Sequence, residues 1–221
     1  RAGVIELGKR YCSEMLKLID KTIDPDAPAV NLVDPSKSVV PYEPPEEYGP
    51  YDGAIAIPGK VQAENYNKGG AEVAYHDESK GNEGGKFRKN DVDIYQPNMG
   101  ITVGHNQKGE WLKYTVNVEA DGEYEISANV GSDNTTGSFV LYMDDKRIGD
   151  EMASAGLGFD SLTVVEGGKV TLTKGEHELK LEITNDWIDI DYVEFKAVTP
   201  SKITKVRLDM TEAESSFSVF D

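Results

Sequence analysis

The stretch that decides the fold reads Glu110-Trp-Leu-Lys-Tyr-Thr-Val-Asn-Val118. Apolar and polar side chains alternate along it, so that its leucine, tyrosine and two valines share one face. Successive side chains of a β-strand point to opposite faces, and this period of two therefore predicts a strand with one buried face. The same alternation recurs over residues 124–130, 139–143 and 179–183.

Turn residues separate these runs at regular intervals. They are Asp121-Gly122, Gly131-Ser-Asp-Asn134, Asp144-Asp145, Gly167-Gly168 and Lys174-Gly175. Many short alternating strands at this spacing are typical of an antiparallel sandwich rather than a parallel sheet. We therefore predict an all-β domain over residues 54–198, and about 145 residues are enough to bury a full core.

Three other segments flank this domain. Residues 1–22 carry apolar side chains at three- and four-residue spacing, which predicts a short helix with one apolar face. Residues 23–53 hold seven of the ten prolines, which predicts an extended linker that is either semi-rigid or fully mobile. Residues 199–221 are interpreted as a tail or as the start of a further module.

Composition excludes several classes of partner. The chain has 23 Lys and Arg against 40 Asp and Glu, a net charge of −17. This balance argues against nucleic acid and anionic lipid, which select basic surfaces. No apolar run approaches the roughly 18 residues that span a membrane. Cys12 is the single cysteine, which excludes an internal disulfide and a cysteine-rich zinc site.

Motifs of catalysis are missing from the sequence. It contains no G-x-S-x-G, H-E-x-x-H, phosphate-loop or dinucleotide-binding motif. The pair Asp91-Val-Asp93 could be interpreted as catalytic carboxylates, but 40 acidic residues produce such pairs by chance. The sequence therefore favours a domain that binds a ligand over one that turns a substrate over.

Two oxygen-rich motifs lie near the two ends of the sandwich. They are Gln62-Ala-Glu64 and Asp189-Ile-Asp191. In a jelly roll the first and last strands commonly pair, so these side chains could converge on a hard cation such as Ca²⁺. The alternative is that they are exposed strand positions in an acidic protein.

Aromatic side chains also occur at loop edges, outside the alternating faces. Trp187 follows Asn185 and Asp186, Phe159 ends a glycine-rich segment, and His105 precedes the turn that begins at Asn106. Sugar rings present flat C–H faces edged by hydroxyls, so a sugar site needs exposed aromatic rings beside short polar side chains. Packing at the rim of the core is the alternative for each ring.

The motifs together resemble carbohydrate-binding module family 6. The stretches that carry the resemblance are Gln62-Ala-Glu-Asn-Tyr66, Val103-Gly-His-Asn-Gln-Lys-Gly-Glu-Trp-Leu-Lys-Tyr-Thr-Val-Asn-Val118, Asp121-Gly-Glu-Tyr124, Lys174-Gly-Glu-His-Glu-Leu179 and Trp187-Ile-Asp-Ile-Asp-Tyr192. The resemblance implies a β-sandwich jelly roll without catalysis. It also implies binding of plant cell-wall β-glycans, often xylan, as an appendage to a secreted hydrolase.

The resemblance assigns a structural calcium ion to particular positions. The family holds this ion by side chains of an E/Q-A-E motif and by the Asp of a final I-D-Y motif. The matching residues are Gln62, Glu64 and Asp191.

The resemblance also assigns a loop-end sugar cleft, and there this sequence departs from the family pattern. His105, Phe159 and Asp189 stand where the family usually has Tyr or Trp, Trp and Asn. Trp187 is our candidate for the missing platform, with Asn185 as its hydrogen-bonding partner. The departures leave a second hypothesis open, a structural or interaction module whose sugar site has decayed and which packs against the catalytic domain. Trp111 is a candidate for a second cleft on the concave sheet face.

The first residues carry a further resemblance. Ala2-Gly-Val-Ile-Glu-Leu-Gly-Lys-Arg-Tyr11 is similar to the last helix of SGNH-type carbohydrate esterases, including acetyl xylan esterases of family 6. This implies that the catalytic residues lie upstream of Arg1 and that an esterase domain acts in cis. The whole would be a secreted bacterial enzyme, targeted to xylan by the module.

Overall fold

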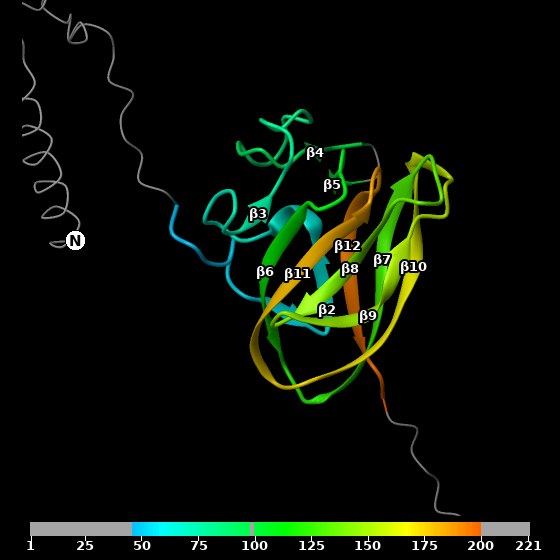
Figure 1. The fold of residues 1–221 in the computed structure, drawn as a ribbon. Helices are drawn as coiled ribbons and strands as arrows, with labels where there is room; N and C mark the ends of the chain where they lie inside the picture. Colours follow the sequence, from blue (N-terminus) through cyan, green and yellow to red (C-terminus); the bar gives the residue numbers. More distant parts are fainter. Residues whose placement is uncertain (1–45, 98–99, 200–221) are drawn as a thin grey trace, which may run out of the picture. The chain divides into compact units, whose positions relative to one another are not determined.

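The computed structural model describes residues 46–97 and 100–199, which form two β-sheets packed face to face (Figure 1). The helix predicted over residues 1–22, most of the predicted linker and nearly all of the predicted tail lie outside the described residues. The predicted all-β sandwich is confirmed. None of the helices among the described residues has the length and apolar character needed to cross a membrane.

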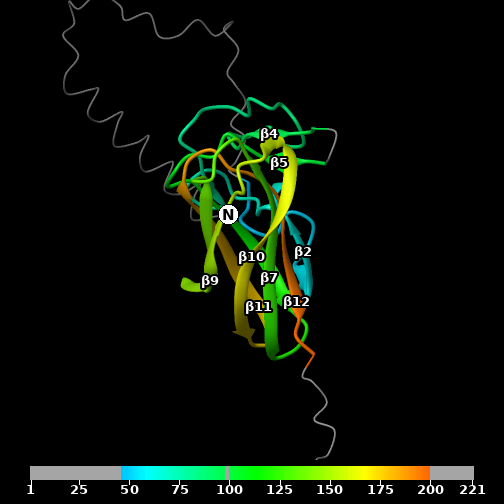
Figure 2. The ribbon, with the colours of Figure 1, turned by 90° about the vertical axis from the view of Figure 1, so that its right-hand side faces the viewer.

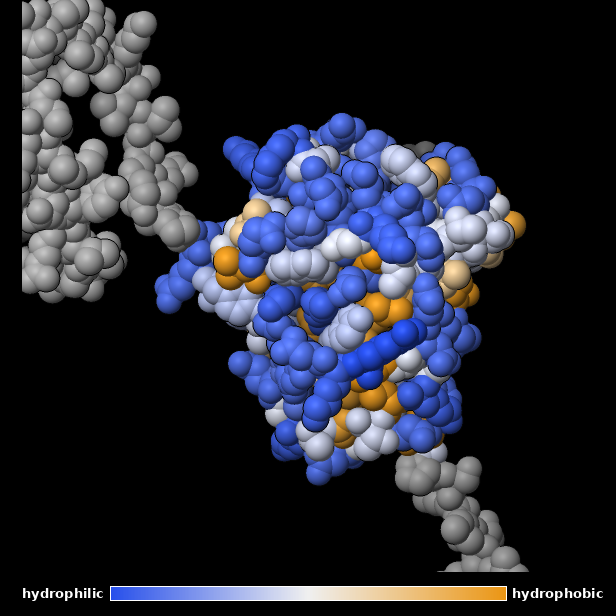
Figure 3. Space-filling view, in the orientation of Figure 1, coloured by the Kyte–Doolittle hydropathy of each residue, from blue (hydrophilic) through white to orange (hydrophobic). Residues whose placement is uncertain are grey.

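The first sheet is built around the stretch that opened the sequence analysis. Its strand order is β1 (Ile55–Ile57), β6 (Trp111–Val118), β11 (Gly175–Asn185), β8 (Ser138–Met143) and β9 (Lys146–Ala153), with β3 (Tyr75–His76) also paired to β6. Its pairs are antiparallel except β1 with β6, which is parallel. Figure 3 shows this face, where apolar residues are visible between hydrophilic ones.

The last strand of the domain lies in the middle of the second sheet. Its order is β10 (Gly158–Leu172), β7 (Gly122–Ser132), β12 (Asp189–Ala197), β5 (Thr102–Val103) and β4 (Ile94–Tyr95), with β2 (Gly59–Gln62) also paired to β12. A single turn of 3-10 helix, η1 (Ala63–Asn65), follows β2. The jelly-roll argument expects the first and last strands to pair. In the structure β1 pairs with β6, and it is the second strand, β2, that pairs with the last, with Gln62 opposite Tyr192. Figure 2 shows β7, β10 and β12 as neighbouring strands of this layer.

The core lies between the two sheets and contains the residues that the alternation selected. In β6 the side chains of Leu112, Tyr114, Val116 and Val118 are all buried, whereas Asn117 is exposed. The runs predicted over residues 124–130, 139–143 and 179–183 become β7, β8 and β11, and their alternating apolar residues are buried as well. The period of two therefore identified the inward faces correctly.

The end of the predicted linker belongs to the sandwich surface. Tyr48 donates its hydroxyl to the Glu178 carboxylate and accepts from the Asn67 amide. Gly49 and Lys68 exchange two backbone hydrogen bonds of 2.8 and 3.2 Å. Residues 48–49 are thus fixed on the outer face of the first sheet.

Antiparallel connections bring alternate loops to one end of the sandwich. The loops that follow β5, β7, β9 and β11 meet there, together with the long segment between β3 and β4, which lies at the upper end in Figure 1. The chemistry-bearing side chains of the sequence analysis gather at this end.

Candidate functional site

A hollow of about 760 Å³ opens among these loops. Residues from six separate segments line it: Gly84, Lys86, Tyr95, Gln96, Pro97, His105, Asp133, Asn134, Phe159, Asp160, Trp187 and Asp189. The hollow is open to solvent on one side and mixes flat rings with short polar side chains. This combination is what recognition of a sugar requires.

Three rings form a connected row inside the hollow. The ring centroids of Tyr95 and His105 are 5.3 Å apart, and those of His105 and Trp187 are 5.9 Å apart with the planes nearly perpendicular. Trp187 keeps 47% of its surface exposed, an unusual fraction for so large an apolar side chain. Its exposed surface is therefore available to a ligand.

The backbone that carries two of these rings adopts the left-handed conformation. His105 has φ of 53° and Trp187 has φ of 68°, which is uncommon for residues other than glycine and costs roughly 1–3 kcal/mol each. The surrounding structure must supply this free energy. Gly137 permits the necessary approach, because a Cβ there would lie 2.6 Å from the Trp187 carbonyl oxygen.

The buried amide of Asn106 joins the two ring-bearing loops. Its side-chain Nδ2 donates to the main-chain carbonyls of Val103 (3.0 Å) and Ile188 (2.6 Å). The main-chain carbonyl of Asn106 accepts from the Trp187 N–H at 2.8 Å. The Ser132 hydroxyl donates to the Trp187 carbonyl. Trp187 is therefore held by its main chain on both sides, which leaves its ring free.

Asp189 provides a half-buried carboxylate at the inner wall of the hollow. The pKa of Asp189 is raised to about 7, mainly by burial. His105 lowers this pKa through its ring and its backbone N–H, and the carboxylates of Asp160 and Asp133 raise it. Gly104 makes room for this carboxylate, since a Cβ there would lie 2.7 Å from Asp189 Oδ1. Asp189 can accept hydrogen bonds from ligand hydroxyls.

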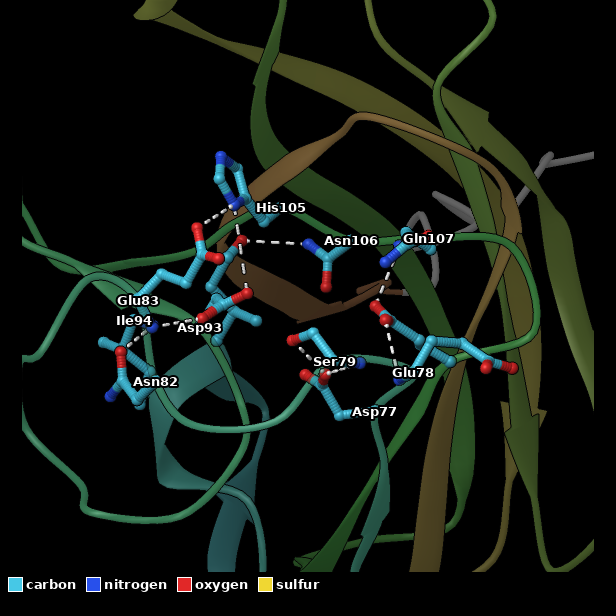
Figure 4. A network of polar contacts seen from close by, with 12 residues as sticks. Asp77, Glu78, Ser79, Asn82, Glu83, Asp93, Ile94, His105, Asn106 and Gln107 are labelled. Carbon is cyan, nitrogen blue, oxygen red and sulfur yellow. Dashed lines mark hydrogen bonds and ion pairs between the residues drawn. The ribbon is translucent and has the colours of Figure 1, made fainter.

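A network of polar side chains contacts His105, one of the residues that line the hollow (Figure 4). His105 Nδ1 lies 3.2 Å from Glu83 Oε2 and 4.0 Å from Asp93 Oδ2, which orients the ring. Further inside, the buried Glu110 accepts backbone N–H groups of Gln107 (2.8 Å) and Glu78 (3.1 Å). Burial raises the pKa of Glu110 to about 7, although these two hydrogen bonds lower it.

The structure brings four of the five predicted sugar-site residues together. His105, Phe159, Trp187 and Asp189 all line the hollow. Asn185 does not, because its amide donates to the Ser138 hydroxyl at 2.7 Å. Tyr95 lines the hollow but was missed by sequence reasoning, since the two-residue strand β4 has no readable period.

The predicted calcium positions lie on neighbouring elements. Gln62 ends β2, Glu64 lies in η1, and Asp191 lies in β12, the strand that pairs with β2. The Asp191 carboxylate accepts a hydrogen bond from the Asn129 amide at 2.8 Å. Glu64 Oε2 is buried without a hydrogen-bond partner among the described residues. Burial raises the pKa of Glu64, and the charge of Asp191 raises it further. A buried, unpartnered carboxylate oxygen beside a second carboxylate fits a hard cation.

Trp111, the candidate for a second cleft, begins β6 in the first sheet, where it is paired with His76 of β3 and Glu182 of β11. Its ring is stacked on His76 with centroids 6.3 Å apart, and the Lys113 ammonium lies 5.6 Å from its centroid. The hollow beside it holds only about 10 Å³. Among the described residues, the loop-end hollow is therefore the roomier site.

The fold and the site define a non-catalytic module that binds carbohydrate. The sequence profile described as carbohydrate binding module (family 6) matches residues 62–197, more than half of the chain. The chain belongs to this family, whose members are binding modules and not enzymes. A search of curated proteins finds no significant match.

Solved structures of family 6 modules are similar to this chain. One whose binding sub-sites were dissected by crystallography and calorimetry has a TM-score of 0.51 at 14% identity, covering 66% of this chain and 98% of its own. A module from Clostridium stercorarium in complex with cellobiose has 0.48 at 16%, covering 66% and 99%. A β-1,3-glucan-binding module from Bacillus halodurans has 0.49 at 18%, covering 66% and 100%. At these identities the likeness concerns the fold.

We expect Asn106→Ala to destabilise the protein by about 2–4 kcal/mol, because it leaves two buried carbonyls without donors. Urea unfolding measures the change. Asn117→Ala, on the exposed face of β6, is the matched control and should change stability little. Equal urea midpoints of unfolding for the two variants would show that Asn106 does not hold together the loops that carry His105 and Trp187.

We expect stability to rise as pH falls from about 8 to about 5.5. The pKa of Glu110 is about 7 in the folded protein and 4.5 in its ordinary range, so in this window only the folded state binds the proton. The contribution is about 1–3 kcal/mol. His76 and His177, whose pKa values are raised by carboxylate partners, act in the same direction. Glu110→Gln should therefore reduce the pH slope of urea stability, and an unchanged slope would contradict the assignment.

Proposed function

We propose that this module binds a plant cell-wall β-glycan in the loop-end hollow, with xylan as the leading candidate. The observation that carries the proposal is the exposed ring of Trp187, held by its main chain in a hollow that also contains a half-buried carboxylate. The complexes with cellobiose and the β-1,3-glucan binding recorded for family members support a β-glycan ligand.

The chemistry of the hollow suits sugar rings in two ways. Trp187, with Tyr95 and Phe159, offers flat apolar surface for C–H faces, while Asp189 accepts hydrogen bonds from the hydroxyls at the ring edge. An open hollow desolvates only part of each sugar, so we expect dissociation constants of about micromolar to millimolar. Tethering to a catalytic domain makes such weak binding useful, since it raises the effective concentration of enzyme at the polymer.

We propose that the module is joined in one chain to a secreted bacterial carbohydrate esterase, with an acetyl xylan esterase as the first candidate. The similarity of residues 2–11 to the last helix of such enzymes supports this proposal. A structural module with a decayed sugar site is the competing hypothesis, and the departures at His105, Phe159 and Asp189 motivate it.

We expect Trp187→Ala to abolish retardation of the module in native gels that contain soluble xylan. Loss of a central stacking ring typically costs about 2 kcal/mol or more, which is roughly thirtyfold in affinity. Val164→Ala is the matched control, because Val164 is also exposed (56%) but lies on β10 and does not line the hollow.

The outcomes separate the two hypotheses. Retardation by xylan that disappears only in Trp187→Ala supports the sugar site. Retardation that persists in this variant would show that xylan binds at another site on the module. A wild-type module that no xylan or β-glucan gel retards would favour the structural hypothesis.

We also propose that Gln62, Glu64 and Asp191 hold a structural Ca²⁺ ion. The unpartnered Glu64 oxygen and the nearby Asp191 carboxylate support this proposal. The ion would neutralise two converging carboxylates and fix η1 against β12.

Chelation should therefore lower the melting temperature. An ion present at 100 times its dissociation constant stabilises the folded state by about 2.7 kcal/mol. Calorimetric melting with chelator, and after adding back Ca²⁺ or Mg²⁺, measures the effect. Glu64→Gln keeps the side-chain shape and should lose the response to Ca²⁺. Identical melting curves with and without chelator would contradict the assignment.

A further inference from the structure

Carboxylates dominate the charge of the loop-end hollow. Asp133, Asp160 and Asp189 line it, and Lys86 is the only lysine or arginine among its lining residues. The chain as a whole carries a net charge of −17. A ligand that enters the hollow therefore meets a negative potential both locally and from the whole domain.

The three carboxylates line the same hollow on three separate segments of the chain. The charges of Asp133 and Asp160 both raise the pKa of Asp189. Asp133 and Asp160 are exposed, and neither side chain has an ion pair or a hydrogen bond among residues 46–97 and 100–199. Their charges are therefore not cancelled by the protein.

The ring nitrogen of His105 already has carboxylate neighbours. Its Nδ1 lies 3.2 Å from Glu83 Oε2 and 4.0 Å from Asp93 Oδ2. The Asn134 side-chain oxygen is likewise occupied, because it accepts from the backbone N–H groups of Thr136 and Gly137. Lys86 is left as the single positive group for an anionic ligand in the described lining.

We propose that this hollow selects neutral glycans and rejects glycans that carry uronate groups, with Asp133 and Asp160 as the specificity-determining residues. The inference rests on the proposed function, since it names the class of glycan that the same site accepts. Neutral sugars present hydroxyl donors, which carboxylates accept as charge-assisted hydrogen bonds. A uronate is ionised at neutral pH and presents acceptors only, so it meets repulsion instead.

The test compares two ligands that differ only in charge. They are a xylo-oligosaccharide with one glucuronosyl branch and the same oligosaccharide after reduction of the carboxyl group to the alcohol. Titration calorimetry gives both affinities, and their ratio is the readout. The ratio is insensitive to a variant that weakens both ligands equally.

For the wild-type module we expect the neutral ligand to bind at least about tenfold more tightly at low salt, because like charges in a partly desolvated site repel strongly. In about 0.5 M NaCl the ratio should fall, since screening weakens charge effects and leaves steric ones unchanged. The double variant Asp133→Asn with Asp160→Asn should bring the ratio near one at low salt. The control Glu119→Gln with Asp145→Asn removes two exposed charges at the opposite end of the sandwich and should keep the wild-type ratio.

Each outcome decides the inference. An affinity ratio near one for the wild-type module, or a ratio that the double variant leaves unchanged, overturns the selection by charge. Neither result contradicts the proposal that the hollow binds sugar. A ratio that the control reduces as much as the double variant also overturns it, because net charge would then be responsible. Binding of neither ligand overturns the xylan proposal and this inference together.

Discussion

The pairing of the last strand, β12, is the constraint on which the rest of the structure depends. β12 is hydrogen-bonded to β7 along most of its length and also to β2 and β5. It therefore joins three parts of the chain that are distant in sequence, and its residues Ile190, Val193 and Phe195 are buried in the core. The same strand begins at the hollow with Asp189 and carries Asp191 beside Glu64, so the proposed sugar site and the proposed ion site share one element.

The main chain of Trp187 is fixed by hydrogen bonds with the Asn106 carbonyl and the Ser132 hydroxyl, in spite of its left-handed backbone. In the proposed sugar site, the position of this ring is therefore set before the ligand arrives. Ordering the ring during folding means that the ligand does not have to supply that free energy on binding. The buried side chain of Asn106 joins the same two loops through the main-chain carbonyls of Val103 and Ile188.

The sequence allowed the sheet faces to be predicted, together with four of the side chains that line the candidate site, and the exceptions have identifiable causes. The alternation in β6 is a local property, because a strand buries every second residue wherever it pairs. Asn185 turns away from the hollow at the end of β11, where the register with β8 shifts between Ile183 and Asn185. Tyr95 lies in a strand too short to show a period, and it reaches the hollow only because β4 pairs with β5.

The sequence by itself determined the all-β class, the inward faces of the long strands, the acidic character of the chain and, through its motifs, its family. Each of these depends on the identity and spacing of residues near one another in the chain. The tertiary structure alone decided which side chains meet in the hollow, how deeply Asp189 is buried and which carboxylates face it. Those properties depend on distances between loops that are far apart in sequence, and such distances are set by strand pairing and packing.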